Sequence, residues 1–371
     1  MTPNKTSATW DIDRQILSPV GRTIEDQLAL RERRQPLEGF EPIYSDIVDY
    51  IIRCTHRIWE EKNIGLCRTH YSDSCVMHTL NGPFQGREGV VQGTLGALAA
   101  FADRIVVGED VIWSEDQPGT YLSSHRITSR STHLGADAVF GGPQLLINSA
   151  TTIADCLVRE NLIIEEWLAR DNARAAYQMG QDPWVIARAQ AAEDLTGDPS
   201  RHGWRTAWIK DVQESDTALP PKDHPAFLPA SALMVAFNGD LYGEAANGCS
   251  QAIEVRWPTG RRGFGRGYWV ACLMQLRAML HAAKFRVDHW AARPLPHGDV
   301  AVALRWSLTG SHRGDGVWGQ PSGRDILILA ISHYRLRGDA IVEDTTVFDE
   351  LAILRQVAGG LTDPSHLGTS G

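Results

Sequence analysis

The sequence predicts an α+β protein of two tandem cone-shaped domains, each a curved and mostly antiparallel sheet wrapped on N-terminal helices. Two observations predict this class. The chain has 371 residues, a length typical of two domains when a domain holds about 100–200 residues. In addition, several residue pairs recur at one nearly fixed spacing, with similar helix and strand patterns around each member of a pair.

Histidines at two predicted strand ends mark the repeat most clearly. His133 and His312 lie 179 residues apart, and each follows a strand pattern and precedes a glycine-rich turn. Arg126 and Arg305 have the same spacing and lie inside those strands. Other pairs keep this order with a shift of at most one residue: Gly86 with Gly265, Arg87 with Arg266, Asp171 with Asp349, and Gln178 with Gln356.

The repeat divides the chain into five parts. A repeat this long exceeds the unit of a solenoid, so each copy is predicted to be a whole domain. We place the copies at residues 40–182 and 222–360. Residues 1–39 are expected to form an N-terminal arm, 183–221 a helical segment followed by an extended linker, and 361–371 a flexible tail.

Each copy begins with helices. Residues 44–63 carry apolar side chains at helical spacing, with Ser45 as the predicted N-cap and with Asp46 and Asp49 placed favourably for the helix dipole. A short strand and a second helix follow. Four segments rich in β-branched and aromatic residues come next, at residues 104–115, 120–133, 144–158 and 162–171.

The order of these elements predicts the architecture. Helices followed by an antiparallel meander are typical of α+β folds, because the parallel crossovers of α/β folds are absent. A curved sheet folded against helices forms a cone, and its mouth can hold a small ligand. A strand-end residue such as His312 is then expected at the rim of a pocket.

Composition excludes several functions. The net charge is −9, and without a stripe of Lys and Arg this argues against nucleic acid as a partner. No run of about 18 apolar residues predicts a membrane span, and the first fifteen residues do not read as a secretory signal, so a cytoplasmic location is expected. The six cysteines form no C-x-x-C pair, which favours buried reduced thiols over disulfides or a zinc site.

Several segments resemble a known family. "FQGREGVVQGTLGALAAFADRIVV", "SRSTHLGADAVFG" and "IIEEWLARDNARAAYQMG" resemble the SnoaL-like polyketide (ester) cyclases of the nuclear transport factor 2-like superfamily, and copy two resembles them through "ALRWSLTGSHRGDGVWGQPSGR" and "IVEDTTVFDELAILRQ". The resemblance implies conical α+β domains, no cofactor, a small-molecule substrate and a homodimer. The superfamily also contains isomerases, dehydratases, lyases, hydrolases and non-catalytic binders.

The resemblance also implies catalytic residues. The family's acid/base aspartate corresponds to Asp171 and, in copy two, to Asp349, and its strand-end histidine corresponds to His133 and His312. His78 is expected at a rim as a further proton donor. Both aspartates also precede a predicted helix start, so N-capping is an alternative for each. The histidines have a structural alternative as well, as turn residues bonded to the backbone.

Arginine and tryptophan side chains are the candidates for substrate binding. Arg126 and Arg305 lie within strands, where they either bind a substrate carboxylate or pair with a nearby acid. Aromatic walls are predicted, with core packing as the alternative, from Trp167, Trp257, Trp306 and Trp318.

The two copies differ at one of these positions. Trp257 lies 179 residues after His78, which predicts that two pockets, if both exist, do not do the same job. His78, His125 and His133 do not have the spacing of a metal site, so no metal is predicted.

Two hypotheses about function remain. The first is a cofactor-independent acid/base enzyme, a cyclase, isomerase or lyase, with an aspartate as general base in a conical pocket. The alternative is a non-catalytic small-molecule-binding or scaffold protein of the same fold. The direction of the Asp171 side chain distinguishes them, because a helix-capping Asp171 favours the binding protein.

Overall fold

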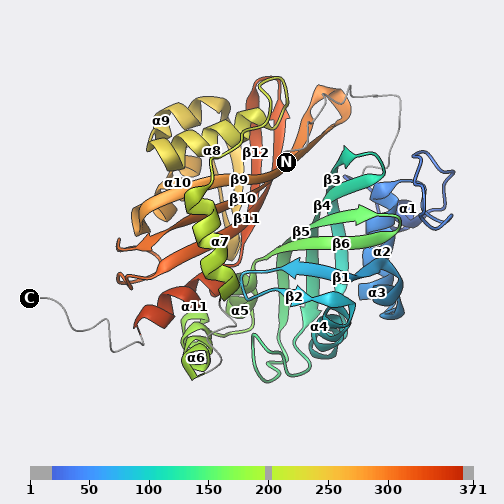
Figure 1. The fold of residues 1–371 in the computed structure, drawn as a ribbon, viewed down its shortest axis with the longest axis horizontal. Helices are drawn as coiled ribbons and strands as arrows, with labels where there is room; N and C mark the ends of the chain where they lie inside the picture. Colours follow the sequence, from blue (N-terminus) through green and yellow to red (C-terminus); the bar gives the residue numbers. More distant parts are fainter. Residues whose placement is uncertain (1–18, 197–202, 362–371) are drawn as a thin grey trace, which may run out of the picture. The chain divides into compact units, whose positions relative to one another are not determined.

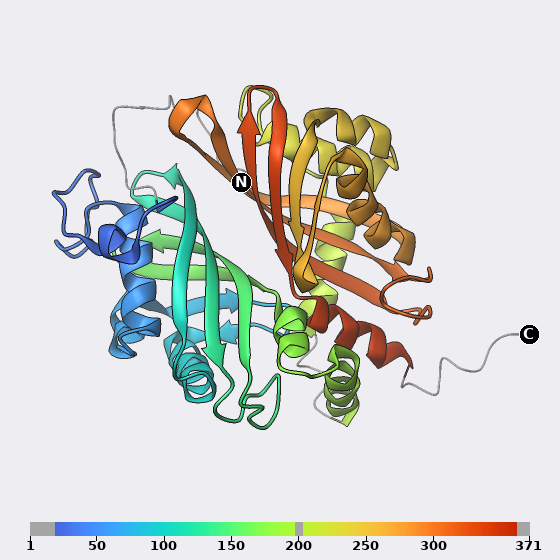
Figure 2. The same cartoon turned by 180° about the vertical axis from the view of Figure 1, so that it is seen from behind.

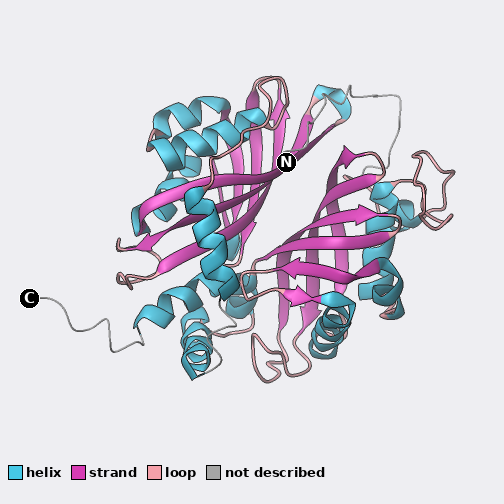
Figure 3. Ribbon diagram, in the orientation of Figure 1, coloured by secondary structure: helices cyan, strands magenta, loops and turns pink. Residues whose placement is uncertain are grey.

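The computed structural model describes residues 19–196 and 203–361. The chain divides into two compact units (Figure 1). The first comprises described residues 19–79, 83–170 and 291–296, and the second comprises 80–82, 171–196, 203–290 and 297–361. Each unit is built on a six-stranded sheet, drawn in magenta in Figure 3.

The first unit carries helices and then a sheet, as the sequence predicts. Its elements are α1 (Ile24–Leu28), α2 (Ile47–Trp59), α3 (Gly65–His70), β1 (Tyr71–His78), β2 (Phe84–Gln85), α4 (Gly86–Ala100), β3 (Ile105–Gln117), β4 (Thr120–Thr132), β5 (Ile147–Arg159) and β6 (Leu162–Arg170).

Three helices precede the same pattern in the second half of the chain. The elements are α5 (Asn172–Gln178), α6 (Pro183–Thr196), α7 (Gly203–Glu214), α8 (Phe227–Gly239), α9 (Tyr242–Ala245), β7 (Cys249–Trp257), β8 (Arg261–Phe264), α10 (Arg266–Met279), β9 (Leu280–Pro294), β10 (Val300–His312), β11 (Asp325–Arg337), β12 (Ala340–Phe348) and α11 (Glu350–Leu361), with short 3₁₀ turns at Ala246–Gly248, Pro258–Gly260 and Pro296–Gly298.

The two sheets have the same strand order. The first runs β2-β1-β6-β5-β4-β3 and the second β8-β7-β12-β11-β10-β9. In the first, β3 to β6 form an antiparallel meander, while β1 pairs with β6 in parallel. Helices α2, α3 and α4 accompany this sheet, as the view from behind in Figure 2 shows. The prediction of two α+β domains with curved, mostly antiparallel sheets is confirmed.

The start of α2 corrects one detail of the sequence analysis. The N-cap is Asp46 and not Ser45: the Asp46 carboxylate accepts a hydrogen bond from the Asp49 N–H at 2.9 Å. Asp49 in turn accepts from the Ser45 N–H at 3.0 Å and pairs with Arg53. A carboxylate interacts more favourably with the positive end of the helix dipole than a hydroxyl does, which explains the shift by one residue.

Strand register gives the correspondence between the units. Thr152 of β5 pairs with Ile127 of β4, and Ala330 of β11 pairs with Trp306 of β10. Equivalent residues of the two units are therefore 179 positions apart between β4 and β10, and 178 positions apart between β5 and β11. In β1, His78 pairs with Trp167, whereas Arg256 of β7 pairs with Thr345. The counterpart of His78 is therefore Arg256, and the match to Trp257 drawn from the sequence is wrong by one residue.

Some expectations lie beyond what the structure describes. Residues 1–18 of the N-terminal arm, 197–202 of the linker and 362–371 of the tail are outside the described residues. The contacts place residues 171–182 with the second unit, whereas the sequence pattern groups them with the first copy. Within the described ranges, no helix combines the length and apolar character that a membrane crossing requires.

Candidate functional site

A cavity in the first unit

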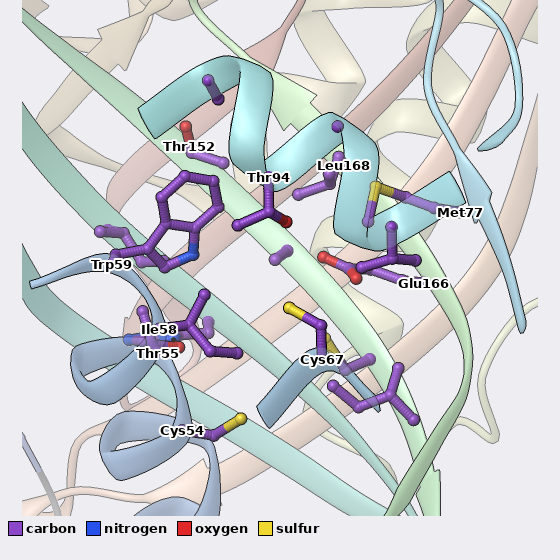
Figure 4. Close-up of a pocket in the computed structure, with 18 of the residues that line it drawn as sticks. Cys54, Thr55, Ile58, Trp59, Cys67, Met77, Thr94, Thr152, Glu166 and Leu168 are labelled. Carbon is purple, nitrogen blue, oxygen red and sulfur yellow. Dashed lines mark hydrogen bonds between the residues drawn. The ribbon is translucent and has the colours of Figure 1, made fainter. Parts of the chain in front are cut away.

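A cavity of about 130 Å³ lies in the first unit, between α2, α4 and one face of the sheet. Figure 4 shows 18 of the residues that line it. The lining is mainly apolar and includes Ile51, Ile58, Trp59, Met77, Val90 and Leu168. Because such a surface excludes water, the few polar groups in it interact with a ligand at low effective dielectric constant.

Strand alternation selects which side chains of β6 face the cavity. Glu166, Leu168 and Arg170 line it. Glu165 and Trp167 therefore lie on the opposite face, because successive side chains of a strand point to opposite sides. In Figure 4 the Glu166 carboxyl group points into the space across from the Trp59 indole.

Burial determines the chemistry of Glu166. The side chain is 5% exposed, and this burial raises the pKa of its carboxyl group to about 7, while the Tyr71 hydrogen bond and the charge of Arg170 act in the opposite direction. At neutral pH the acid and the carboxylate are then present in comparable amounts, so one group can both accept and return a proton.

Tyr71 is the direct hydrogen-bond partner of Glu166. It is the first residue of β1, and its hydroxyl donates to Glu166 Oε2 at 3.1 Å. Burial raises the pKa of the Tyr71 phenol well above its usual value, so the phenol stays neutral and keeps its proton for this bond. The two residues are 95 positions apart in sequence, and the parallel pairing of β1 with β6 brings them together.

His125 supplies a neutral imidazole to the cavity lining. It lies on β4, and its burial lowers its pKa to about 3. The Nδ1 atom lies 3.5 Å from the Thr55 hydroxyl, and Nε2 has no hydrogen-bond partner among the described residues. A permanently neutral imidazole can position an oxygen of a ligand, but it does not supply positive charge.

Two arginines also line the cavity. Arg104 precedes β3, and its guanidinium lies 4.9 Å from the centroid of the Trp59 ring and 5.2 Å from that of Phe101. Arg170 ends β6. Since Arg170 is four residues beyond Glu166, their Cα atoms are about 13 Å apart along the strand.

Positions of the residues predicted from sequence

Asp171 does not line this cavity; it belongs to the second unit and is the N-cap of α5. Its carboxylate accepts hydrogen bonds from the N–H of Thr259 at 2.9 Å and of Arg174 at 3.2 Å. Burial raises the pKa of Asp171 to about 6, and these two bonds act in the opposite direction. This placement favours the capping alternative, and the catalytic role stays a prediction.

Asp349 has a similar position before α11. Its Oδ1 accepts from the Ala352 N–H at 3.1 Å, the geometry of an N-cap, and its Oδ2 accepts from the amides of Asn81 at 3.0 Å and Asn172 at 2.6 Å. These three donors belong to the same unit as Asp349.

Each of the two strand-end histidines forms a hydrogen bond to the backbone of the loop that follows it. His133 is fully buried, stacks on Phe101 and accepts the Gln144 N–H at Nδ1. His312 is likewise buried and accepts the Ser322 N–H at the equivalent atom. Burial lowers the pKa of His312. Neither histidine lines the cavity, and both have the backbone partner that the structural alternative requires.

His78, Trp167 and Arg126 lie on the other face of the first sheet. The His78 ring stacks on Trp167, with centroids 5.3 Å apart, and its Nε2 lies 2.8 Å from Glu165 Oε1. Arg126 pairs with Glu109 at 2.9 Å. Because Met77, Ile127 and Glu166 line the cavity, the neighbouring positions in each strand point away from it.

The remaining candidates lie in the second unit. Trp306 faces the helices and donates to Ser332 at 2.9 Å, and Trp318 donates to Glu350 at 3.1 Å. Arg305 lies on the opposite face of β10, beside Ser307, which α7 covers through the Trp208 indole at 3.1 Å. Figure 1 shows α7 crossing this face. The sequence left open which face of this strand lines the cone, and the structure assigns it to Trp306.

Large side chains fill the interior of the second unit. The positions equivalent to Ile127, Cys156 and Arg170 carry Trp306, Tyr334 and Phe348. All three side chains are at most 3% exposed. Trp306 packs against Phe237 and Phe285, with ring centroids 6.0 and 5.8 Å apart.

The counterpart of Glu166 is Asp344, since both pair with equivalent positions of the neighbouring strand. Burial raises the pKa of Asp344 to about 6. Its oxygens accept from the Trp269 indole at 2.8 Å, the Trp257 indole at 3.3 Å and the Thr346 hydroxyl at 2.7 Å. Three donors occupy this carboxyl group, whereas one phenol contacts Glu166.

Cysteine and metal chemistry are not indicated by the described residues. All six cysteines are free and buried, and burial raises the pKa of Cys67 and Cys54 beside the cavity, so both stay as thiols. Within the described ranges no group of three or more His, Cys, Asp or Glu side chains is arranged to hold a metal ion.

Sequence reasoning did not select Glu166, Tyr71, Arg104 or Arg170. The available signal was the alternation in "LIIEEWLAR", which places Glu166, Leu168 and Arg170 on one face of a strand. That signal identifies a shared face, but the structure was needed to show that this face borders a cavity.

Comparison with known proteins

Residues 268–357 match the family of SnoaL-like polyketide cyclases. This segment of the second unit is therefore similar in sequence to the SnoaL-like cyclases. The strand order of the unit that contains it recurs in the first unit, so the two units share one sheet topology. No protein with a curated description is significantly similar to the chain in sequence.

Several solved structures are similar to one domain's length of the chain. IdmH from Streptomyces antibioticus is 21% identical, with a TM-score of 0.31, over 36% of this chain and 96% of its own. A SnoaL-like protein from Jannaschia sp. CCS1 is 14% identical, with a TM-score of 0.31, over 39% of this chain and 100% of its own. TsrD from Streptomyces laurentii is 16% identical, with a TM-score of 0.29, over 35% of this chain and 91% of its own.

Proposed function

We propose that the first unit is a cofactor-independent acid/base enzyme acting on a small organic substrate, with Glu166 as the group that transfers the proton. The observation that carries the proposal is a buried carboxyl group whose pKa is about 7 and which faces an apolar cavity. General acid/base catalysis is most efficient when the catalytic pKa lies near the working pH.

The reaction begins with removal of a proton from a carbon next to a carbonyl group. The Glu166 carboxylate takes the proton, and the C–H electron pair moves into an enolate whose charge lies on the carbonyl oxygen. In one outcome the enolate carbon attacks a second carbonyl carbon of the substrate, the π bond of that carbonyl breaks, and its oxygen takes the proton from Glu166. In a second, another carbon of the enolate system takes the proton from Glu166. In a third, the enolate electrons expel a leaving group from the β-carbon, and the leaving group takes the proton. These outcomes are cyclisation, isomerisation and elimination, and each returns Glu166 to its starting state.

Tyr71 is a positioning residue in this proposal. Its O–H bond to Glu166 Oε2 orients the carboxyl group and leaves Oε1 for the substrate. The same bond stabilises the carboxylate and keeps its pKa from rising further. The apolar lining holds the substrate and excludes water that would compete for the proton.

The second function is a non-catalytic small-molecule-binding protein of the same fold. The capping role of Asp171 favours it, since the aspartate that the family resemblance implies as the base is occupied by two backbone N–H groups. In that case Glu166 binds a ligand but does not cycle its proton. A homodimer and a cytoplasmic location stay predictions for either function.

Hydrogen–deuterium exchange tests the proposal without the natural substrate. Acetophenone, cyclohexenone and 4-acetylbenzoate are incubated with the full chain in deuterated buffer, and loss of the signal of the protons next to the carbonyl is followed by proton NMR. We expect exchange of at least one ketone above the buffer rate, and a loss of about 10²–10⁴-fold in Glu166→Gln.

Glu165→Gln is the matched control, because Glu165 is the preceding residue of the same strand and faces the other way. It should exchange at the wild-type rate. Equal rates in wild type and Glu166→Gln, or no exchange of any of the three ketones, would contradict the enzyme and favour the binding protein.

A further inference from the structure

We infer that Arg104 and Arg170 form an anion-binding subsite in the cavity of the first unit, and that its substrate is a small cyclic organic acid. The carboxylate of the substrate binds the two guanidinium groups, and its reacting carbon lies toward Glu166. This assignment deepens the proposed function and rests on it for the reacting end only.

Two positive charges share one wall of the cavity. Both arginines line it, and Arg170 is among the groups whose charge lowers the pKa of Arg104, which burial and this repulsion bring to about 10. Two guanidinium groups placed near each other in a partly apolar site destabilise one another. An anion between them removes that repulsion.

Among the described residues neither arginine forms an ion pair at contact distance, although the charge of Arg170 acts on Glu166. In the same unit, by contrast, Arg53 pairs with Asp49, Arg87 with Asp73, and Arg126 with Glu109. The carboxylates whose charges reach Arg104 most strongly are Asp137 and Asp103.

These two carboxylates already accept hydrogen bonds from backbone N–H groups. Asp103 Oδ1 accepts the Thr132 N–H at 2.8 Å, and Asp137 Oδ1 accepts the N–H groups of Val139 and Phe140 at 2.7 and 3.0 Å. They moderate the charge of Arg104 from a distance and leave its N–H groups available for a ligand.

The aromatic contacts of Arg104 hold the flat face of its guanidinium group and do not use the N–H donors along its edge. Its guanidinium lies over the rings of Trp59 and Phe101. Stacking of this kind uses the flat face of the group and leaves the N–H donors along its edge. The Nε atom is shielded from solvent and has no hydrogen-bond partner among the described residues, so one donor that can bind a carboxylate is unused.

The cavity size indicates a single ring. Its volume is about 130 Å³, and an engineered apolar cavity of about 150 Å³ in another protein holds benzene. The Trp59 indole provides a flat wall, and the hydroxyls of Ser129 and Thr152 line the cavity near Arg170, which pairs with Thr152 across the sheet. A ring that carries one carboxylate satisfies all these groups.

Calorimetric titration of the full chain with benzoate and its neutral isostere benzamide tests the subsite. We expect benzoate to bind at least about tenfold more tightly than benzamide. Arg104→Gln and Arg170→Gln should each weaken benzoate about 10- to 100-fold, the range of a charged hydrogen bond, with little change for benzamide. Arg130→Gln is the matched control, because Arg130 is exposed on β4, and it should bind benzoate as wild type does.

Equal affinity for benzoate and benzamide in the wild-type chain would overturn the subsite, and this comparison needs no variant to fold. If phenyl phosphate binds tenfold more tightly than benzoate, the assignment of a carboxylate to the subsite is overturned, and a phosphate ester is the ligand class instead. Two results together separate this proposal from the proposed function. If benzoate binding depends on the two arginines, in wild type and in Glu166→Gln alike, the subsite stands. If the ketone exchange does not depend on Glu166, the proposed function is contradicted and the subsite stays intact.

Discussion

The interiors of the two units differ although their sheets have the same strand order. Equivalent positions carry Ile127 and Cys156 in the first unit, and Trp306 and Tyr334 in the second. The first unit keeps a cavity with one titratable carboxyl group, whereas aromatic side chains pack against one another in the second. The same architecture therefore supports a binding site or a packed core, depending on the volume of a few inward-facing side chains.

The largest expected effect concerns packing at one equivalent position. Trp306→Ala should lower the free energy of unfolding by about 3–5 kcal/mol, because it empties part of a filled core. Ile127→Ala should cost at most about 2 kcal/mol, the low end for such a change, because Ile127 already borders a cavity. Urea unfolding of both variants measures this, and equal losses would contradict the contrast between the interiors.

An intermediate effect concerns the carboxyl group in the open interior. The pKa of Glu166 is about 7 in the folded state and 4.5 ordinarily, so the folded state keeps a proton that the unfolded state releases between these values. The unfolding free energy contributed by Glu166 thus falls as the pH rises from 4.5 to 7. Glu166→Gln should be more stable than wild type by about 2–3 kcal/mol at pH 8.

The control for this pH dependence is again Glu165→Gln. At pH 5 the advantage of Glu166→Gln should nearly disappear, whereas replacement of the half-buried Glu165 should change stability by less than about 1 kcal/mol at either pH. Urea titrations at both pH values provide the data. An advantage of Glu166→Gln that does not depend on pH would show that its carboxyl group titrates normally.

The smallest expected effect comes from a substitution that makes the interior of the first unit resemble that of the second. Ile127→Trp places the residue of the filled unit at the cavity wall, and it should weaken benzoate binding at least about tenfold, or about 1.4 kcal/mol. Stability should change by about 1–3 kcal/mol at most, the usual range for an enlarged core side chain. Titration calorimetry and thermal unfolding test the two halves of this prediction, and unchanged affinity would place the ligand elsewhere.

The fold could be predicted from the sequence because its evidence is periodic. His133 with His312 and Arg126 with Arg305 mark the same two strand positions in each copy, and local patterns of apolar residues mark the helices and strands around them. The one-residue shift between copies also follows from the register of the strands. Such signals need only local sequence and a constant spacing.

The site could be predicted less well because its evidence is not local. Glu165 and Glu166 are adjacent and chemically identical, and only the direction of the sheet's face separates the one in the cavity from the one outside. Tyr71 contacts Glu166 through a parallel strand pair that joins distant segments. For Asp171 the sequence offered a base and a helix cap, and these alternatives need coordinates to be distinguished.

The two strand-end histidines have a consequence for how the following loops are held. At His133 and His312 the Nδ1 atom accepts a backbone N–H from the far end of the following loop, at Gln144 and Ser322. An imidazole that gains a second proton has no lone pair left to accept with. The segments 134–143 and 313–321 are thus each held to their sheet by an Nδ1 lone pair, and at His312 burial lowers the pKa of the ring and so favours the uncharged form that this bond requires.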